Sequence, residues 1–272
     1  MGLNSAYDTL AVELDSSAFR AIRYGADGVS AFNVAIDPAK ESVLEALEAA
    51  VYSSEALTAD YARTRVLVRT AAYTLALPEL ATEATLIAHF ADPERHTVIT
   101  DPTAADICVV WAMENECIDF LRRTFRNAPL QHVLTPLIPY FTRCSRRRNN
   151  AKIFVHLNNS GAPWADIAAF DAQGRLLGLV SRPASTPLDT LYYIAALCRR
   201  CRLDIASDEI NICGDALRRN ALLAILPRYA ANTLPMPYPA EAVANGADLT
   251  NEKNLKNFQK TLAICGVMLY DR

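Results

Sequence analysis

One feature of the sequence constrains its fold most: three strands followed by a proline-started helix occur twice, about 145 residues apart. Alternating apolar residues predict the strands of the first copy at 9–14, 19–24 and 29–36. The same signals predict the strands of the second copy at 151–157, 164–170 and 175–181. In each copy a glycine-containing hairpin turn, with Gly28 or Gly174, precedes the third strand. A period this long favours a duplicated domain over a stack of short repeats.

The helix that follows the third strand has a start signal in both copies. In the first copy we expect Asp37 as the N-cap and Pro38 at the first helical position. In the second copy Thr186 is expected to cap the helix and Asp189 to complete a capping box. Strands and helices continue to alternate after these helices. The sequence therefore predicts an α/β fold of two lobes, residues 1–150 and 151–272, each built from a β-β-β-α-β-α unit.

Further along the first copy, residues 65–69 and 73–77 both have the composition of strands. We expect them to pair as a hairpin.

Composition narrows the class of protein. The formal net charge is −3, without the basic excess usual in nucleic-acid-binding proteins. No stretch has the roughly 18 uninterrupted apolar residues that predict a membrane-spanning helix, and the first residues lack the pattern of a signal peptide. The seven cysteines are scattered, and most stand in apolar segments, as is typical of buried free thiols. We expect a cytoplasmic protein that does not bind nucleic acid.

Five short segments occur in a defined order: Leu130–Ile138, Lys152–Leu157, Gly174–Leu177, Asp189–Ile194 and Ile210–Gly214. Together they resemble an uncharacterised bacterial family with an actin-like ATPase (ribonuclease H-like) fold. That family is similar to the cytosolic actin-like subunits of type IV pilus and type II secretion machines. The resemblance extends over nearly the whole chain and implies a fold without implying an activity.

An actin-type ATPase would hold its nucleotide between the lobes, on three loops. The first would supply an Asp that orients Mg²⁺ and amides that surround the phosphates. Here it contains Asp15, Ser16 and Ser17, with no glycine to permit close backbone approach. The same residues also suit an ordinary polar hairpin turn.

The other two loops depart further from the ATPase pattern. The second contains Asn158, Ser160 and Gly161, with Asn where the ATPases have Asp, so it brings no charge to position a metal. The third contains Gly214, but Asp215 stands where a second glycine is expected and would repel phosphate. Asp215 also suits the N-cap of the next helix. We interpret the three loops as a degenerate nucleotide site.

Other candidate sites have simpler interpretations. Cys198 and Cys201 form a single C-x-x-C pair at the end of a helix, without a second ligand pair for zinc. The four histidines (His89, His96, His132 and His156) form no metal-ligand pattern. The basic run Arg143–Arg148 could meet an anionic membrane or an acidic partner, or could be a solvated helix end.

Two classes of function follow. We favour a non-catalytic or weakly nucleotide-binding protein that acts by contacting another protein. It needs no cofactor, although ATP and Mg²⁺ stay open as ligands and a homodimer stays open as an assembly. The alternative is an enzyme of the same superfamily, an ATPase or a sugar-kinase-like phosphotransferase that uses Asp15 and the turn at Gly214.

Overall fold

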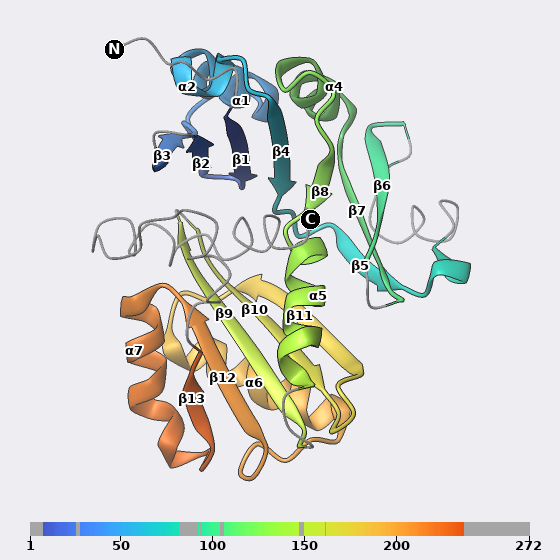
Figure 1. Cartoon of the computed structure of the whole chain (residues 1–272), viewed down its shortest axis with the longest axis vertical. Coiled ribbons are helices and arrows are strands. Elements are labelled where there is room, and N and C mark those ends of the chain that lie inside the picture. Colours follow the sequence, from blue (N-terminus) through green and yellow to red (C-terminus); the bar gives the residue numbers. More distant parts are fainter. Residues whose placement is uncertain are drawn as a thin grey trace.

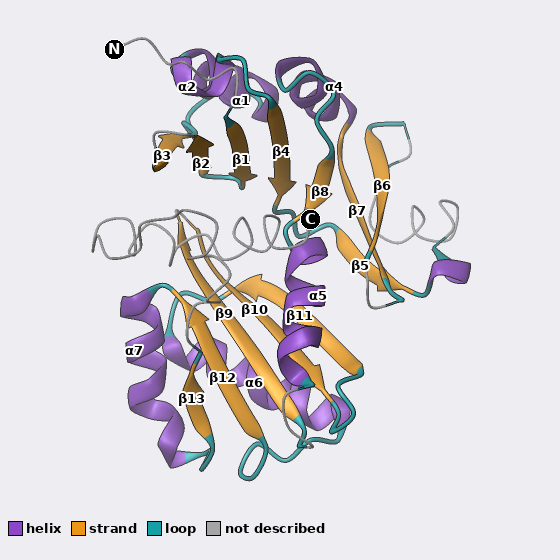
Figure 2. Ribbon diagram, viewed as in Figure 1, coloured by secondary structure: helices purple, strands orange, loops and turns teal. Residues whose placement is uncertain are grey.

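The computed structural model describes residues 8–25, 28–81, 92, 94–103, 106–146, 150–160 and 162–236. Its strands form two five-stranded sheets, one in each lobe, and a three-stranded sheet beside the first lobe (Figure 1). Helices pack against both five-stranded sheets, and in the second sheet they cover both faces (Figure 2). The arrangement is therefore a layered α/β fold.

The first sheet has the order β3-β2-β1-β4-β8. Its strands are β1 (Thr9–Leu14), β2 (Ala18–Gly25), β3 (Gly28–Ala35), β4 (Arg63–Val68) and β8 (Leu130–His132). The helices of this half are α1 (Val43–Tyr52), α2 (Glu55–Thr58), α4 (Asn115–Thr124) and α5 (Leu134–Ser145). Strand β1 pairs antiparallel with β2 and parallel with β4, so the first predicted strand becomes the centre of the sheet.

The second sheet has the equivalent order, β11-β10-β9-β12-β13. Its strands are β9 (Lys152–Ser160), β10 (Ala162–Phe170), β11 (Leu176–Pro183), β12 (Glu209–Gly214) and β13 (Thr233–Pro235). The helices of this half are α6 (Pro187–Cys201), α7 (Ala216–Ile225) and the short 3-10 helix at Leu226–Arg228. Strand β9 pairs antiparallel with β10 and parallel with β12, as β1 does with β2 and β4.

The predicted duplicated α/β architecture is confirmed. Each unit also has a further short parallel strand: β8 in the first, where a strand was expected at 131–135, and β13 in the second. The hairpin predicted from residues 65–69 and 73–77 is wrong, because β4 joins the first sheet between β1 and β8.

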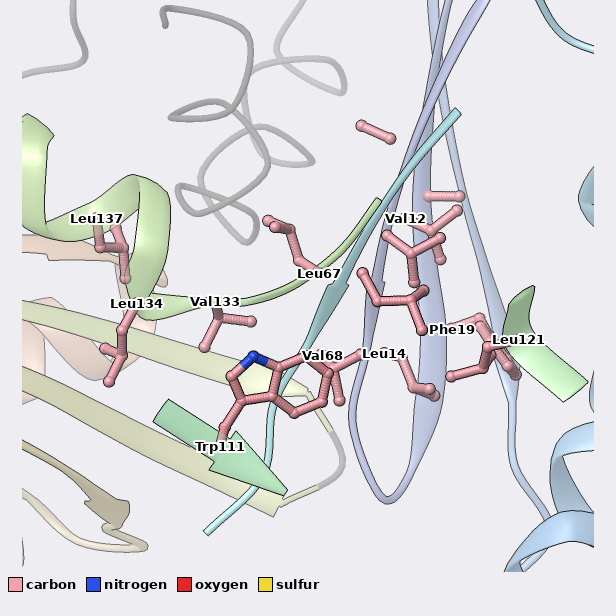
Figure 3. Close-up of a cluster of buried hydrophobic side chains, with 14 of the residues drawn as sticks. Val12, Leu14, Phe19, Leu67, Val68, Trp111, Leu121, Val133, Leu134 and Leu137 are labelled. Carbon is pink, nitrogen blue, oxygen red and sulfur yellow. The ribbon is translucent and has the colours of Figure 1, made fainter. Parts of the chain in front are cut away.

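The three-stranded sheet interrupts the first unit between β4 and α4. It is antiparallel, in the order β5-β7-β6, with β5 (Tyr73–Ala76), β6 (His96–Pro102) and β7 (Cys108–Glu114). A 3-10 helix at Pro78–Leu80 follows β5. Figure 3 shows Trp111 of β7 beside Val68 and Leu14 of the first sheet. The inserted sheet therefore shares a hydrophobic core with the first lobe.

Helix α5 connects the two lobes. It follows β8 of the first sheet but packs on β10 of the second, where the Phe141 ring stacks on Phe154 of β9 at 5.1 Å. Alternate residues of β9 serve the two faces of this sheet: Phe154 faces α5, whereas Ile153 and Val155 belong to the core that contains residues of α6 and α7. Each large apolar side chain buried in this way stabilises the fold by roughly 1.5–3 kcal/mol.

The helix starts differ between the two copies. Thr186 caps α6 in the predicted capping box with Asp189, and Pro187 is its first residue. The N-cap expected at Asp37 is wrong: α1 begins after Ser42, whose hydroxyl accepts a hydrogen bond from the Glu45 amide. Asp37 instead accepts a hydrogen bond from the Ala39 amide in a local turn.

Candidate functional site

The duplicated sheets bring the predicted loops together between the lobes. Leu14 is paired with Val68 at the ends of β1 and β4, and Leu157 is paired with Gly214 in the second sheet. Asp15 and Asn158 directly follow Leu14 and Leu157 and so occupy equivalent places. The carboxyl ends of parallel strands are the usual location of ligand sites in α/β sheets.

Asp15 is buried and bonded to its own turn. Its Oδ1 accepts hydrogen bonds from the Ser17 amide (2.8 Å), the Ser17 hydroxyl (2.6 Å) and the Ala18 amide (3.0 Å). Its Oδ2 accepts one from Arg20 Nη2 at 2.9 Å. Burial raises the pKa of this carboxyl, but Arg20 and the Ser17 hydrogen bonds outweigh burial, so the pKa lies below its usual value. Ser16 is exposed.

A second carboxylate, Glu13, links Asp15 to the other lobe. Its Oε1 accepts hydrogen bonds from Arg20 Nη2 at 3.0 Å and from Asn158 Nδ2 at 3.1 Å. Asn158 lies in β9 with no exposed surface. The predicted residues Asp15 and Asn158 are therefore joined through Arg20 and Glu13 in one buried network across the lobes.

A buried ion pair also joins the lobes. Arg69, directly after β4, donates to both carboxylate oxygens of Asp166 in β10, at 2.7 and 3.1 Å. Asp166 also accepts from the Ser181 hydroxyl at 2.5 Å and faces His156 Nδ1 at 2.9 Å. Burial raises the pKa of Asp166, but Arg69 and His156 lower it well below its usual range. The two lobes are thus joined by a bidentate pair whose members are fully buried.

The third predicted loop is shaped by close packing. Gly214 has φ of +99°, and a Cβ added there would lie 2.2 Å from the carbonyl oxygen of Leu157. Asp215 caps α7 by accepting a hydrogen bond from the Arg218 amide at 3.0 Å. The Arg218 guanidinium donates to the carbonyl oxygens of Asn158, Trp164 and Ala184. Glycine is required at position 214 because β12 approaches the backbone of β9 too closely there for a side chain.

The remaining predicted residues contribute less. Ser160 ends β9, and Gly161 lies outside the described residues. Glu13, Arg20, Arg69 and Asp166 were not predicted as site residues. A signal was present, because three of these charged residues stand inside apolar strand patterns (TLAVEL, FRAIRY and WADIAAF), where an unpaired charge would be costly.

A pocket of about 480 Å³ lies beside this network in the first lobe. It is lined by the ends of β1, β4 and β7, the loop between β3 and α1, and the starts of α1 and α4. Its apolar lining includes Leu14, Ile36, Val43, Leu47, Val68 and Met113. Its charged lining is mostly acidic, with Asp15, Asp37, Glu41 and Glu114 against Arg69 and Lys40. Lys40 pairs with Glu45, and Arg69 with Asp166. The arrangement suits an apolar segment that carries a positive charge.

The other candidates from the sequence occupy ordinary structural positions. Cys198 and Cys201 are free thiols in the last turns of α6, and burial raises the pKa of Cys198 to about 11. In the basic run, Arg143 is exposed in the last turn of α5 and Arg146 is its exposed C-cap, while Arg147 and Arg148 lie outside the described residues. His89 also lies outside them.

His132 is a core residue. It is fully buried and stacks on the Tyr73 ring at 5.0 Å. Burial lowers its pKa to about 3. Among the described residues, no group of three His, Cys, Asp or Glu side chains could hold a metal ion, and no helix is long and apolar enough to span a membrane.

The comparisons with known proteins agree with this architecture. A family model described as "Protein of unknown function (DUF3822)" matches residues 4–233. A crystal structure from Bacteroides thetaiotaomicron, of a protein with actin-like ATPase fold and unknown function, is similar with a TM-score of 0.72 and 19% identity. The match covers 93% of this chain and 96% of that one. The sequence's resemblance to an uncharacterised family with an actin-like ATPase fold is confirmed.

A second similar structure is the PilM–PilN type IV pilus biogenesis complex. Its TM-score is 0.57 at 12% identity, and the match covers 96% of this chain and 97% of that one. No curated protein matches the sequence. At these identities the similarity establishes the fold alone.

Proposed function

We propose that this chain, which belongs to the family of proteins of unknown function DUF3822, is a non-catalytic interaction protein on an actin-like scaffold. The observation that carries the proposal is the buried network between the lobes, centred on the Arg69–Asp166 pair. In an actin-like ATPase this is where the phosphates and Mg²⁺ would lie. In this chain the side chains of the predicted loops and their neighbours bond to one another between the lobes, which supports a non-catalytic role.

The residues of the first loop do not fit a magnesium ion. A carboxylate that orients Mg²⁺ or its waters needs oxygens directed at the ion. Both oxygens of Asp15 already accept hydrogen bonds, from Ser17, Ala18 and Arg20. Arg20 adds a positive charge beside them, which disfavours a cation. In the second loop, Asn158 supplies its amide to Glu13 and brings no charge.

We place the partner site at the lobe-one pocket, the 480 Å³ cavity between the first sheet and the inserted sheet. Its apolar and mostly acidic lining favours an apolar peptide segment that bears Lys or Arg. PilM, similar in fold, is known in complex with a protein, PilN, and this supports a protein as the partner class.

We also place the protein in the cytoplasm. Cys108, Cys117, Cys144, Cys198 and Cys213 are buried free thiols, and Cys201 is a partly buried one. Free cysteines are the usual state in a reducing compartment. Immunodetection in fractionated cells checks this, and recovery from the periplasm would contradict it.

The test of the nucleotide part is thermal unfolding with and without millimolar Mg-ATP. A ligand at 100 times its dissociation constant would add about 2.7 kcal/mol of stability. We expect no shift. A shift that disappears in Asp15→Ala would instead support the ATPase or phosphotransferase alternative.

The test of the interaction part is selection of displayed random peptides on the intact protein. We expect enrichment of apolar peptides with Lys or Arg. Val43→Lys, at a half-exposed lining residue of the pocket, should weaken their binding at least about tenfold, or ~1.4 kcal/mol. Tyr52→Lys, which also introduces a lysine at an exposed apolar residue but at the far end of α1 and outside the pocket, is the control. Peptides that bind Val43→Lys as well as wild type would overturn the site.

A further inference from the structure

A second groove, of about 420 Å³, runs along the edges of two different sheets. Strand β11 ends the order of the second sheet and β5 ends that of the inserted sheet, so within the described residues each pairs on one side only. Residues 73–77 line the groove from the β5 side and residues 176–180 from the β11 side. It shares no lining residue with the lobe-one pocket. A site here goes beyond the proposed function and stands without it.

The backbone of β11 offers unpaired groups to this groove. In an antiparallel pair the N–H and C=O of alternate residues face the partner strand, and those between face away. The Ser181 amide donates to the Tyr73 hydroxyl at 2.7 Å, so Ser181 faces away from β10. Leu179 stands two residues earlier in the same regular register and also faces away. No described residue is found to hydrogen-bond to the outward groups of Leu179.

The Tyr73 side chain already hydrogen-bonds to the edge of β11 at Ser181. Its hydroxyl accepts from the Ser181 amide and lies 3.4 Å from the Ser181 carbonyl oxygen, as a neighbouring strand would. The tyrosine therefore closes one end of the groove and leaves the stretch from Leu176 to Val180 open. A free strand edge next to a preformed partner contact is the arrangement used in β-strand addition.

The side chains around the open edge define the ligand further. Two large apolar residues of the lining are well exposed, Leu77 (55%) and Leu177 (42%). Among the described residues, the charged ones that line the groove are Arg182 and Arg200, both exposed, and no described carboxylate lines it. The groove therefore favours an extended segment with apolar side chains and an acidic residue at the arginine end.

We propose that this groove binds an extended, apolar and acidic segment of another protein, which adds as a strand to the free edge of β11. Backbone hydrogen bonds to Leu179 would give affinity for the extended conformation. Contacts with Leu77 and Leu177 and pairing with Arg182 and Arg200 would select the sequence. Leu75 of β5 lines the opposite side of the groove. The Ala112 amide donates to the Ala72 carbonyl, so in this register the backbone groups of Leu75 face away from β7.

The test uses the full chain and a fluorescently labelled eight-residue peptide of alternating Val and Thr with two Glu at one end. Fluorescence anisotropy should show saturable binding below about 1 mM, a typical weak affinity. The same peptide with Lys in place of Glu should bind at least tenfold more weakly. N-methylation of alternate amides, which removes the strand hydrogen bonds, should abolish binding. Hydrogen exchange of the Leu179 amide should slow when the first peptide binds.

Variants of exposed residues locate the site without disturbing the core. Arg182→Glu with Arg200→Glu should weaken the Glu peptide at least tenfold and reverse the preference toward the Lys peptide. Leu188→Ser, a well-exposed leucine of α6 outside the groove, is the matched control and should bind as wild type.

Three results would overturn the proposal. One is the absence of saturable binding by folded wild-type protein. Another is equal binding of the N-methylated peptide, which would show contact through side chains alone. The third is a wild-type dimer in sedimentation that Leu77→Lys dissociates, because a second copy of the chain would then occupy the groove. Each result leaves the lobe-one pocket untouched, so failure here is distinguishable from failure of the proposed function.

Discussion

Each lobe has an equivalent corner, the space bounded by the end of its central strand and two helices, but this space is open in one lobe and largely filled in the other. In the first lobe the corner among β1, α1 and α4 is an open pocket of about 480 Å³. In the second lobe the equivalent corner among β9, α6 and α7 encloses only about 200 Å³. Both corners have the same strand order and the same paired strand ends.

The difference comes from one side chain and one insertion. Arg218, the third residue of α7, reaches into the second corner and donates to three carbonyl oxygens. Cys117, the third residue of α4, is short and leaves the first corner open. In the first lobe the three-stranded sheet stands between β4 and α4, whereas α7 follows β12 directly. A shared backbone unit can therefore either keep or lose a cavity, depending on a few residues.

The largest expected effect tests whether the two lobes form one unit. Asp166→Ala would leave Arg69 buried without its carboxylate and should lower the free energy of unfolding by about 3–5 kcal/mol, measured by urea denaturation. The double variant Arg69→Met, Asp166→Leu should recover much of that loss. A cost below about 1 kcal/mol for Asp166→Ala would show that the lobes do not depend on this pair.

The next effect tests the closed corner itself. Arg218→Met keeps the apolar stem but removes the donors to three buried carbonyl oxygens, so we expect a loss of about 2–3 kcal/mol in urea denaturation. The matched control is Arg219→Met, since no hydrogen bond is found for that guanidinium among the described residues; it should cost much less. Equal costs for the two variants would mean that the carbonyl contacts do not hold the corner.

The pH dependence of stability tests the packing between the first sheet and the inserted sheet, where His132 is buried. Because its folded pKa of about 3 lies below its unfolded value near 6.5, the unfolded state binds the proton first. Stability should therefore fall as the pH drops from about 6.5 toward 4, by roughly 2–3 kcal/mol from this residue. His132→Gln should show a flatter pH dependence in the same measurement. An unchanged slope would place the titration elsewhere.

The smallest effect compares the two helix starts. Ser42→Ala and Thr186→Ala each remove an N-cap hydroxyl and should each cost about 1 kcal/mol in thermal or urea unfolding. Asp37→Ala should cost less than about 0.5 kcal/mol, as expected for an exposed turn residue. A larger cost at Asp37 than at Ser42 would contradict the observed start of α1.

Much of the fold could be predicted because its signals are local. Alternation of apolar residues located β1 and β9 within a residue of their observed starts, and the Thr186–Asp189 box located the start of α6. One local prediction failed, the N-cap at Asp37, because α1 begins after Ser42. The predicted hairpin failed because strand pairing depends on contacts between distant segments. Residues 65–69 and 73–77 have the local pattern of a hairpin, yet β4 pairs with β1 and β8, and β5 pairs with β7 in another sheet. The division at residue 150 stays a prediction, while α5 packs on the second sheet.

The candidate site was predictable only in part. Asp15, Asn158 and Gly214 were expected near one another, because the resemblance to actin-like ATPases implies three loops that meet between the lobes. Their partners were not expected, because Glu13 and Asn158 are 145 residues apart and Arg69 and Asp166 are 97 apart. A sequence pattern shows that a charge stands inside an apolar strand, but not which opposite charge neutralises it.

The sequence by itself determined the duplicated unit, the order of its strands and helices, and the departure of three loops from the ATPase pattern. Those properties depend on neighbours a few residues apart. Only the tertiary structure decided that Arg69 crosses to Asp166, that Arg218 closes one corner and that the other stays open. Those properties depend on which groups meet after the sheets pack, where a buried charge requires a partner and an unfilled volume remains a pocket.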